Sequence, residues 1–240
     1  MWATLGITKL RLRHPSWIAK LAVTKCPSHH RALCIPRSAR GLQLSSRHFS
    51  GRENMAATFR VGAFGYTVRG DVGALPTTYN SMVEHATLHD DFDINGAGGT
   101  ALVISVESAA SGWPELVVSQ RFEPGPEAGF FPGALLVPEN HLLFIGAGTR
   151  LLAYDLRSVR RVWEDAAETG FWEWKRHDDV VLMSAELEFA AWDLRGKKMW
   201  TAYVEPPWDY AVRNGRVELD IMDRKSSFHI KTGPVTRERE

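Results

Sequence analysis

The sequence predicts an all-β domain of stacked antiparallel units that follows a short basic leader. Three observations support this fold class. A segment occurs twice in the second half of the chain at an offset of 38 residues, apolar and polar positions alternate within each copy, and turn-forming residues separate the apolar runs. A β-sandwich is the alternative architecture for such a pattern.

The first 52 residues differ sharply in charge from the rest of the chain. They hold ten Lys and Arg and no Asp or Glu, whereas residues 53–240 carry a net charge of −9. This composition resembles that of a mitochondrial transit peptide, and Arg47-His48-Phe49-Ser50 resembles a matrix processing site. The alternative is that Met55 is the true start of a cytoplasmic protein. We therefore divide the chain into a leader over 1–54, expected to be disordered, and a single β-repeat domain over 55–240.

Charge and cysteine content exclude several classes of function from this domain. An acidic domain repels phosphate, so we expect no nucleic-acid partner. Both cysteines, Cys26 and Cys34, lie in the leader, which excludes a disulfide framework, a Cys-ligated zinc site and a Cys nucleophile from the domain. No apolar run reaches the roughly 20 residues that span a bilayer. The remaining partner classes are a protein or a small-molecule ligand. The sequence does not define the oligomeric state of the domain.

The repeat itself lies in residues 143–163 and 181–200. Ala153-Tyr154-Asp155-Leu156 falls on Ala191-Trp192-Asp193-Leu194, and the alternation around both motifs is typical of strands with two partly buried faces. Each copy is predicted to hold four strands joined by turns. Such a unit cannot bury its own faces, so it must stack on its neighbours.

Other segments extend the pattern. Trp163 matches Trp200 at the end of the two copies, and we expect both in the core because aromatics at a fixed repeat position pack neighbouring units. A third, shorter copy begins at Tyr210, where Asn214-Gly215 is a strong hairpin signal. Upstream, residues 101–107 and 115–122 are predicted to form another hairpin. Only residues 77–90 are predicted to be helical.

Over residues 133–230 the chain resembles the blade repeat of quinoprotein-type (PQQ-like) β-propellers and, more distantly, WD-repeat propellers. The shared run is a hydrophobic strand, a Gly-rich turn, an aliphatic-Ala-aromatic-Asp motif, a short basic turn and Trp. The resemblance implies a small or incomplete β-propeller of about four blades of about 40 residues. The family's turn glycine is present as Gly196 and is replaced near Val159. We carry over the blade fold and no quinone chemistry, so no cofactor is implied.

Four aromatic residues are candidates for ligand binding: Trp172, Trp174, Trp208 and Tyr210. Trp172 and Trp174 alternate along one predicted strand, so they would share a face, either in the core or as a platform for a flat ligand. Trp208 and Tyr210 follow Pro206-Pro207, which forms either a rigid linker or one wall of a recognition groove.

Asp91, Asp93 and Asn95, followed by Gly96, have the spacing of a calcium-binding loop. Alternate oxygen ligands suit a hard cation, and glycine permits the sharp turn. The twelfth position of an EF-hand loop would be Leu102 in place of Glu, so any calcium site here departs from that pattern. A solvated acidic turn is the alternative.

Just upstream, His85 and His89 are spaced to share one face of a helix, as a transition-metal site requires. Two functions follow from these candidates. The leading hypothesis is a non-enzymatic binding or interaction module of unknown ligand, because a β-repeat fold alone supplies no chemistry. The alternative is a metal-dependent, hydrolytic enzyme that uses the acidic and histidine residues of segment 84–96.

Overall fold

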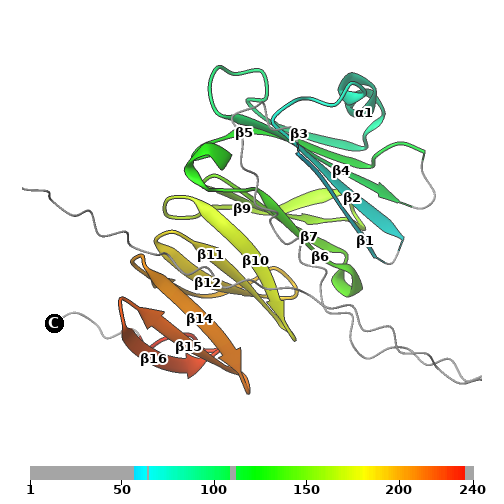
Figure 1. The fold of residues 1–240 in the computed structure, drawn as a ribbon. Helices are drawn as coiled ribbons and strands as arrows, with labels where there is room; N and C mark the ends of the chain where they lie inside the picture. Colours follow the sequence, from blue (N-terminus) through cyan, green and yellow to red (C-terminus); the bar gives the residue numbers. More distant parts are fainter. Residues whose placement is uncertain (1–56, 64, 109–111, 236–240) are drawn as a thin grey trace, which may run out of the picture. The chain divides into compact units, whose positions relative to one another are not determined.

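The computed structural model describes residues 57–63, 65–108 and 112–235, and these form four β-sheets that follow one another along the chain (Figure 1). The all-β fold class is therefore confirmed, and the two-sheet sandwich alternative is wrong. The predicted leader, with Cys26 and Cys34, lies outside the described residues, and so its targeting role stays a prediction.

The first sheet has five strands in the order β1-β2-β4-β5-β3. Its strands are β1 (Ala57–Ala63), β2 (Tyr66–Val72), β3 (Leu88–Phe92), β4 (Thr100–Ser108) and β5 (Leu116–Phe122). The predicted hairpin of residues 101–107 and 115–122 is confirmed as the antiparallel pair β4–β5. In contrast, β3 pairs in parallel with β5 at the edge of the sheet.

The predicted helix over 77–90 is correct only in its first part. Helix α1 (Tyr79–His85) packs Met82 onto Val103 and Val117 on the outer face of the first sheet. The prediction is wrong beyond it, because residues from Leu88 onward form β3. Leu88 and Phe92 are half-buried and pack against the core between the first two sheets. Residues 88–92 form a strand there because β5 offers a free edge with which they pair in parallel.

The second and third sheets are successive copies of one four-stranded unit. The second contains β6 (Gly133–Val137), β7 (Leu142–Ala147), β8 (Arg150–Asp155) and β9 (Arg160–Ala166); the third contains β10 (Phe171–His177), β11 (Val180–Ala185), β12 (Glu188–Asp193) and β13 (Lys198–Tyr203). Each strand of the third sheet starts 38 residues after its counterpart. The predicted repeat and its offset are therefore confirmed. Two short 3-10 helices, η1 (Pro126–Ala128) and η2 (Pro138–Asn140), flank β6.

The fourth sheet is a three-stranded version of the same unit. Its strands are β14 (Trp208–Arg213), β15 (Arg216–Ile221) and β16 (Arg224–His229). Asn214 and Gly215 have φ values of 50° and 72° and join β14 to β15, which confirms the hairpin predicted there. The unit starts at Trp208, two residues before the predicted Tyr210.

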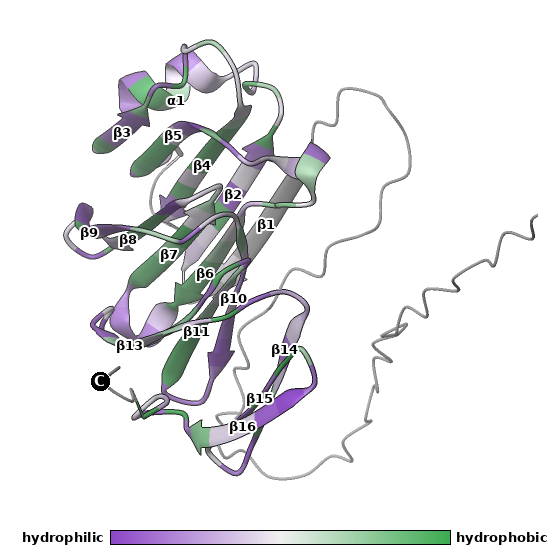
Figure 2. Ribbon diagram, turned by 90° about the vertical axis from the view of Figure 1, so that its left-hand side faces the viewer, coloured by the Kyte–Doolittle hydropathy of each residue, from purple (hydrophilic) through white to green (hydrophobic). Residues whose placement is uncertain are grey.

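Three hydrophobic clusters hold the four sheets together as a stack. One lies between the first and second sheets, one between the second and third, and one between the third and fourth. The central strands β4, β5 and β7 are mostly hydrophobic in Figure 2, as expected for strands buried on both faces. None of the clusters among the described residues joins the first sheet to the fourth, so these blades form an open, incomplete propeller.

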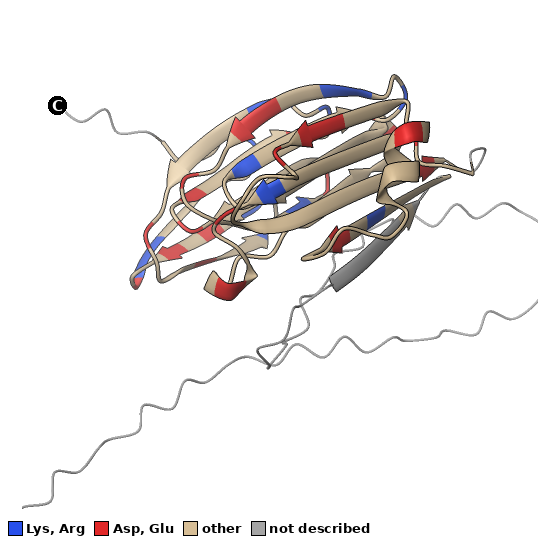
Figure 3. Ribbon diagram, turned by 90° about the horizontal axis from the view of Figure 1, so that it is seen from above, with Lys and Arg blue, Asp and Glu red and all other residues tan. Residues whose placement is uncertain are grey.

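The outward face of the fourth sheet is polar. Val217 and Leu219 point to the third sheet and are buried, whereas their neighbours Arg216, Glu218 and Asp220 point away. A polar outer face is typical of the terminal unit of a repeat array. Acidic and basic segments interleave along the strands in Figure 3.

The two repeat tryptophans lie at the junctions between units. Trp200 is buried in the cluster between the third and fourth sheets, which confirms the core prediction for it. Trp163 is half-buried and stacks on Trp192 with ring centroids 5.8 Å apart. Val159, where the family pattern has glycine, has a φ of 46°, while Gly196 at the matching turn has a φ of 83°.

Candidate functional site

Three loops of the third sheet meet at one edge of the stack. The β9–β10 loop is tied to the β11–β12 turn by a 3.0 Å hydrogen bond from the Glu186 amide to the Gly170 carbonyl. The β11–β12 turn is tied to the β13–β14 loop by a 3.1 Å bond from the Val204 amide to the Leu187 carbonyl. These backbone bonds fix the loops relative to one another, so side chains at this edge have a rigid base.

A β-bulge in β10 decides where its two tryptophans point. The register of β10 against β11 shifts between Phe171 and Glu173, so Phe171 and Trp174 both face the second sheet. Trp174 packs among core aromatics and is buried. Trp172 lies on the opposite side and is 37% exposed. The prediction that Trp172 and Trp174 share a face is therefore wrong, because the extra residue of the bulge reverses the alternation between them.

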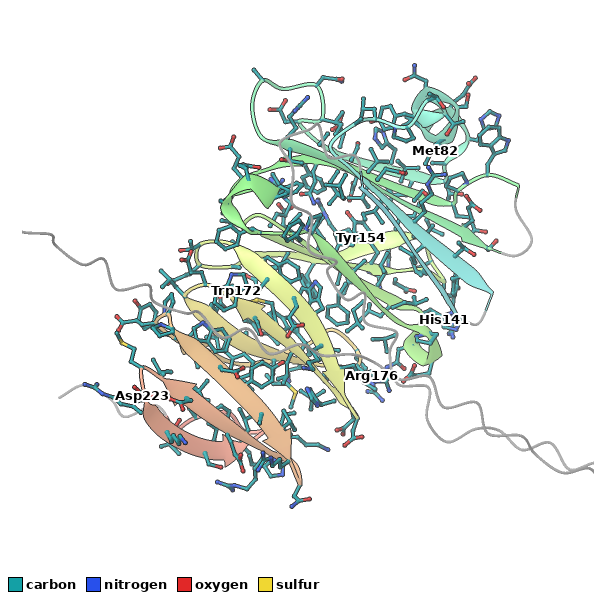
Figure 4. The ribbon with its side chains drawn as sticks, viewed as in Figure 1. Met82, His141, Tyr154, Trp172, Arg176 and Asp223 are labelled. Atoms are coloured by element: carbon teal, nitrogen blue, oxygen red, sulfur yellow. The ribbon has the colours of Figure 1, made fainter. Side chains whose placement is uncertain are left out.

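The structure brings together the other three predicted aromatics, Trp172, Trp208 and Tyr210, which we call the aromatic strip. Trp172 stacks on Trp208 with centroids 5.4 Å apart and planes 19° apart, and Trp208 stacks on Tyr210 at 6.3 Å and 24°. Phe189 lies against both Trp208 and Tyr210 on the core side. In Figure 4, Trp172 lies at the left-hand edge of the third sheet, on the side of the molecule where Asp223 also lies. The strip thus runs from the interface core to the solvent.

Trp208 is held in place by a hydrogen bond as well as by stacking. Its Nε1 donates a 3.1 Å hydrogen bond to the Glu186 carbonyl. In the loop before it, the Pro207 carbonyl accepts a hydrogen bond from the Met222 amide. Tyr203, at the end of β13, is 61% exposed and donates to Glu205 at 3.3 Å. Residues 206–207 therefore serve as the predicted connection between units and also place Trp208 beside Trp172.

The inner end of the aromatic strip is polar and buried. The Tyr210 and Ser184 hydroxyls lie near each other between the sheets, and neither makes a hydrogen bond of good geometry within the described residues. Burial raises the pKa of Tyr210, and the Glu173 carboxylate raises it further. The His177 ring lies edge-on to Tyr210 with centroids 6.4 Å apart. Burial lowers the pKa of His177, and Lys175 lowers it further. Both shifts favour the neutral form of the ring concerned.

Three glutamates lie in the loops at the exposed end of the strip. Glu168, Glu186 and Glu205 belong to the loops that meet there, and among the described residues none of them forms an ion pair with Lys, Arg or His. Glu168 and Glu205 both raise the pKa of Tyr203, after the desolvation of that hydroxyl. Sequence reasoning missed Tyr203 and these three glutamates, although the aromatic-and-acid composition of the segment around Pro206-Pro207 was an available signal.

The candidate calcium loop begins within β3, at the edge of the first sheet, and continues past its end. Asp91, Asp93 and Asn95 are exposed, and the Asp91 carboxylate accepts a 2.9 Å hydrogen bond from the Ile94 amide. The Arg121 guanidinium donates to the Ile94 carbonyl at 3.0 Å and also to two glycine carbonyls of the loop. The loop therefore already holds a cationic side chain on its carbonyl oxygens, and its calcium site stays a prediction.

The predicted pairing of His85 with His89 is wrong. His85 ends α1, binds the Ser81 carbonyl at 2.8 Å and stacks on Trp113. His89 lies in β3, under the helix, where its Nε2 is 2.8 Å from the Ser119 hydroxyl. The helix ends between the two histidines, so they do not share a face. Within the described residues, no group of three or more His, Cys, Asp or Glu side chains is arranged to hold a metal ion.

A cavity of about 290 Å³ lies between the first and second sheets. Its lining residues are Arg121, Phe122, Glu123, Ala147, Thr149, Arg150, Glu164, Asp165 and Ala166. The basic side chains already have partners: Arg121 binds the loop carbonyls, and Arg150 pairs with Glu164 at 3.0 Å and stacks over Phe92. The aromatic strip is therefore the stronger candidate site.

Comparison with known proteins adds little to this geometry. No protein-family model and no curated protein matches the sequence. Among solved structures, the chain is similar to "The crystal structure of BamB from Moraxella catarrhalis", with 15% identity, a TM-score of 0.29, and coverage of 55% of this chain and 46% of that one. The chain thus matches less than half the length of that protein. A likeness this low carries no argument, so the site rests on its own geometry.

None of the helices in the described part of the chain is long and apolar enough to cross a membrane.

Proposed function

We propose that residues 55–240 form a non-enzymatic β-repeat binding module whose binding surface is the exposed end of the aromatic strip. The observation that carries this proposal is the stacked pair of Trp172 and Trp208. A tryptophan that is 37% exposed, stacked on a second ring and set on hydrogen-bonded loops is a rigid apolar surface with little entropy left to lose on binding. Such surfaces are typical of interaction sites.

No observation favours the metal-dependent enzyme. That alternative needs several ionisable groups that converge in one cleft, whereas His85 and His89 lie on different elements. A hydrogen-bonded cluster of catalytic residue types, Tyr79, His89 and Ser119, does lie under α1. Ser119 is fully buried there, so its hydroxyl does not reach a substrate in this structure.

A peptide-library selection against the full chain tests the proposed function. We expect enriched peptides to lose at least tenfold in affinity on Trp172→Ala. The matched control is Trp113→Ala. Trp113 is 40% exposed and also stacks on a neighbouring ring, that of His85, but it lies in the β4–β5 loop of the first sheet. If no peptide is enriched, or if both variants bind the peptides as the natural chain does, the aromatic strip is not a binding surface.

A further inference from the structure

The charges around the aromatic strip indicate what kind of partner it takes. Glu168, Glu186 and Glu205 lie in the loops at its exposed end without a cationic partner in the described part of the chain. Lys198 is paired with Asp165 and Glu188, and Lys175 lies over the Tyr210 ring at the inner end of the strip, 5.6 Å from its centroid. The exposed end is thus an aromatic surface with an uncompensated negative charge.

The aromatic surface itself suits a planar cation. Trp172 and Trp208 are nearly parallel, and the hydrogen bond from Trp208 Nε1 to the Glu186 carbonyl fixes the pair beside an acidic residue. Cations are attracted to the face of a tryptophan ring, which is the best of the aromatic side chains for this contact. A guanidinium is planar, stacks on aromatic rings and also pairs with carboxylates, whereas an ammonium is a strongly hydrated point charge.

We propose that the aromatic strip binds an arginine side chain of a basic, extended peptide. The guanidinium stacks on Trp172, and the carboxylates of Glu186 and Glu205 supply the opposite charge. The acidic balance of the domain, −9 over residues 53–240, favours the approach of such a peptide. This inference rests on the proposed function, because it names the partner of the same surface.

The test uses the full chain and three hexapeptides of alternating glycine with arginine, lysine or citrulline. Citrulline keeps the planar shape of arginine but has no charge. We expect the arginine peptide to quench tryptophan fluorescence saturably and to bind at least tenfold more tightly than the citrulline peptide. We expect the lysine peptide to fall between them, and the affinity for arginine to decrease with added salt.

Two sets of variants separate this site from general attraction to an acidic protein. Trp172→Ala and the double variant Glu186→Gln/Glu205→Gln should each weaken arginine binding at least tenfold. Two control variants should change the affinity for the arginine peptide by less than twofold. They are Trp113→Ala and Glu84→Gln/Glu107→Gln, which removes two acidic groups from the region of the first sheet.

The outcomes distinguish the two proposals. Equal binding of the arginine and citrulline peptides, with both still lost on Trp172→Ala, would overturn the cation inference and leave the binding surface in place. Equal loss in both glutamate double variants would also overturn it, since the attraction would then be general. Arginine binding that Trp172→Ala does not change would remove the aromatic strip as the site altogether.

Discussion

Trp163 of the second sheet donates a 2.7 Å hydrogen bond from its indole Nε1 to the carbonyl of Gly196 in the third sheet. Trp200, one repeat later, donates a bond of the same length to the carbonyl of Ile230, just after β16. Each tryptophan therefore fixes the last strand of one unit to the chain that follows the third strand of the next. This shared contact is a physical reason for the matched tryptophans in the sequence.

Trp200→Ala should destabilise the fold more than Trp208→Ala. Trp200 is buried and loses both its packing and the bond to Ile230, and replacing a buried tryptophan by alanine costs about 3–5 kcal/mol. Trp208 is half-buried, so less apolar area is lost. Urea denaturation of both variants measures the difference. Equal midpoints would contradict the role of Trp200 at the junction. The denaturation midpoint of Trp200→Phe should lie between those of the natural chain and Trp200→Ala.

Gly196→Ala should destabilise more than Gly215→Ala, although both glycines have positive φ, 83° and 72°. A left-handed conformation costs an alanine about 1–2 kcal/mol at either position. At Gly196 the new Cβ would also lie 3.0 Å from Leu142 Cδ2 and 3.1 Å from Trp163 Nε1, whereas at Gly215 the nearest atom is 3.8 Å away. Thermal melting of the two variants compares them. An equal decrease in melting temperature in both variants would mean that Leu142 and Trp163 move aside to accommodate the new Cβ.

Tyr154→Phe should make stability less sensitive to alkaline pH. The Tyr154 hydroxyl donates a 2.8 Å hydrogen bond to Asp90 across the first two sheets, and Figure 4 shows it between them. Burial, followed by the bond to Asp90 and its charge, raises the pKa of Tyr154 above its ordinary value of 10.0. The unfolded chain therefore loses this proton first, so the stabilisation is full below about pH 10 and falls as the pH rises further.

The measurement for Tyr154→Phe is urea denaturation from pH 8 to pH 11.5. At pH 8 the variant should lose about 1 kcal/mol, the usual contribution of one hydrogen bond. Above pH 10 its stability should fall less steeply with pH than that of the natural chain. Parallel pH profiles would show that Tyr154 does not carry this dependence.

The repeat could be predicted from the sequence because its signal is local and occurs twice. The motif around Tyr154 and Trp192 fixes the offset of 38, and all four strands of the third sheet start at that offset from those of the second. The Asn214-Gly215 turn needs positive φ at both positions, which few other dipeptides adopt readily. Such features depend on neighbouring residues alone.

The errors arose where tertiary contacts override local pattern. Nothing in the sequence near Trp172 marks the bulge that places it opposite Trp174, because a bulge is defined by the pairing with β11. Residues 88–92 suit either a helix or a strand until β5 is available as a partner. The aromatic residues of the candidate site could be predicted from the sequence. Its glutamates could not, because they lie in three loops that are far apart in the sequence and come together only in the folded chain.

Calcium should bind only weakly, if the predicted role of Asp91, Asp93 and Asn95 is correct. One oxygen of Asp91 already accepts the Ile94 amide, and Arg121 already binds the Ile94 carbonyl, so a calcium ion must compete with both contacts. A dissociation constant on the order of 10⁻⁴ M, as in weak extracellular modules, then stabilises the native state by about 1.4 kcal/mol at a tenfold higher calcium concentration. Melting curves of the full chain with 1 mM calcium, on the order of ten times that constant, should show a rise of a few degrees, and Asp91→Asn/Asp93→Asn should abolish it. An unchanged melting temperature in the natural chain, or the same rise in the double variant, would leave this loop as an acidic turn held by Arg121.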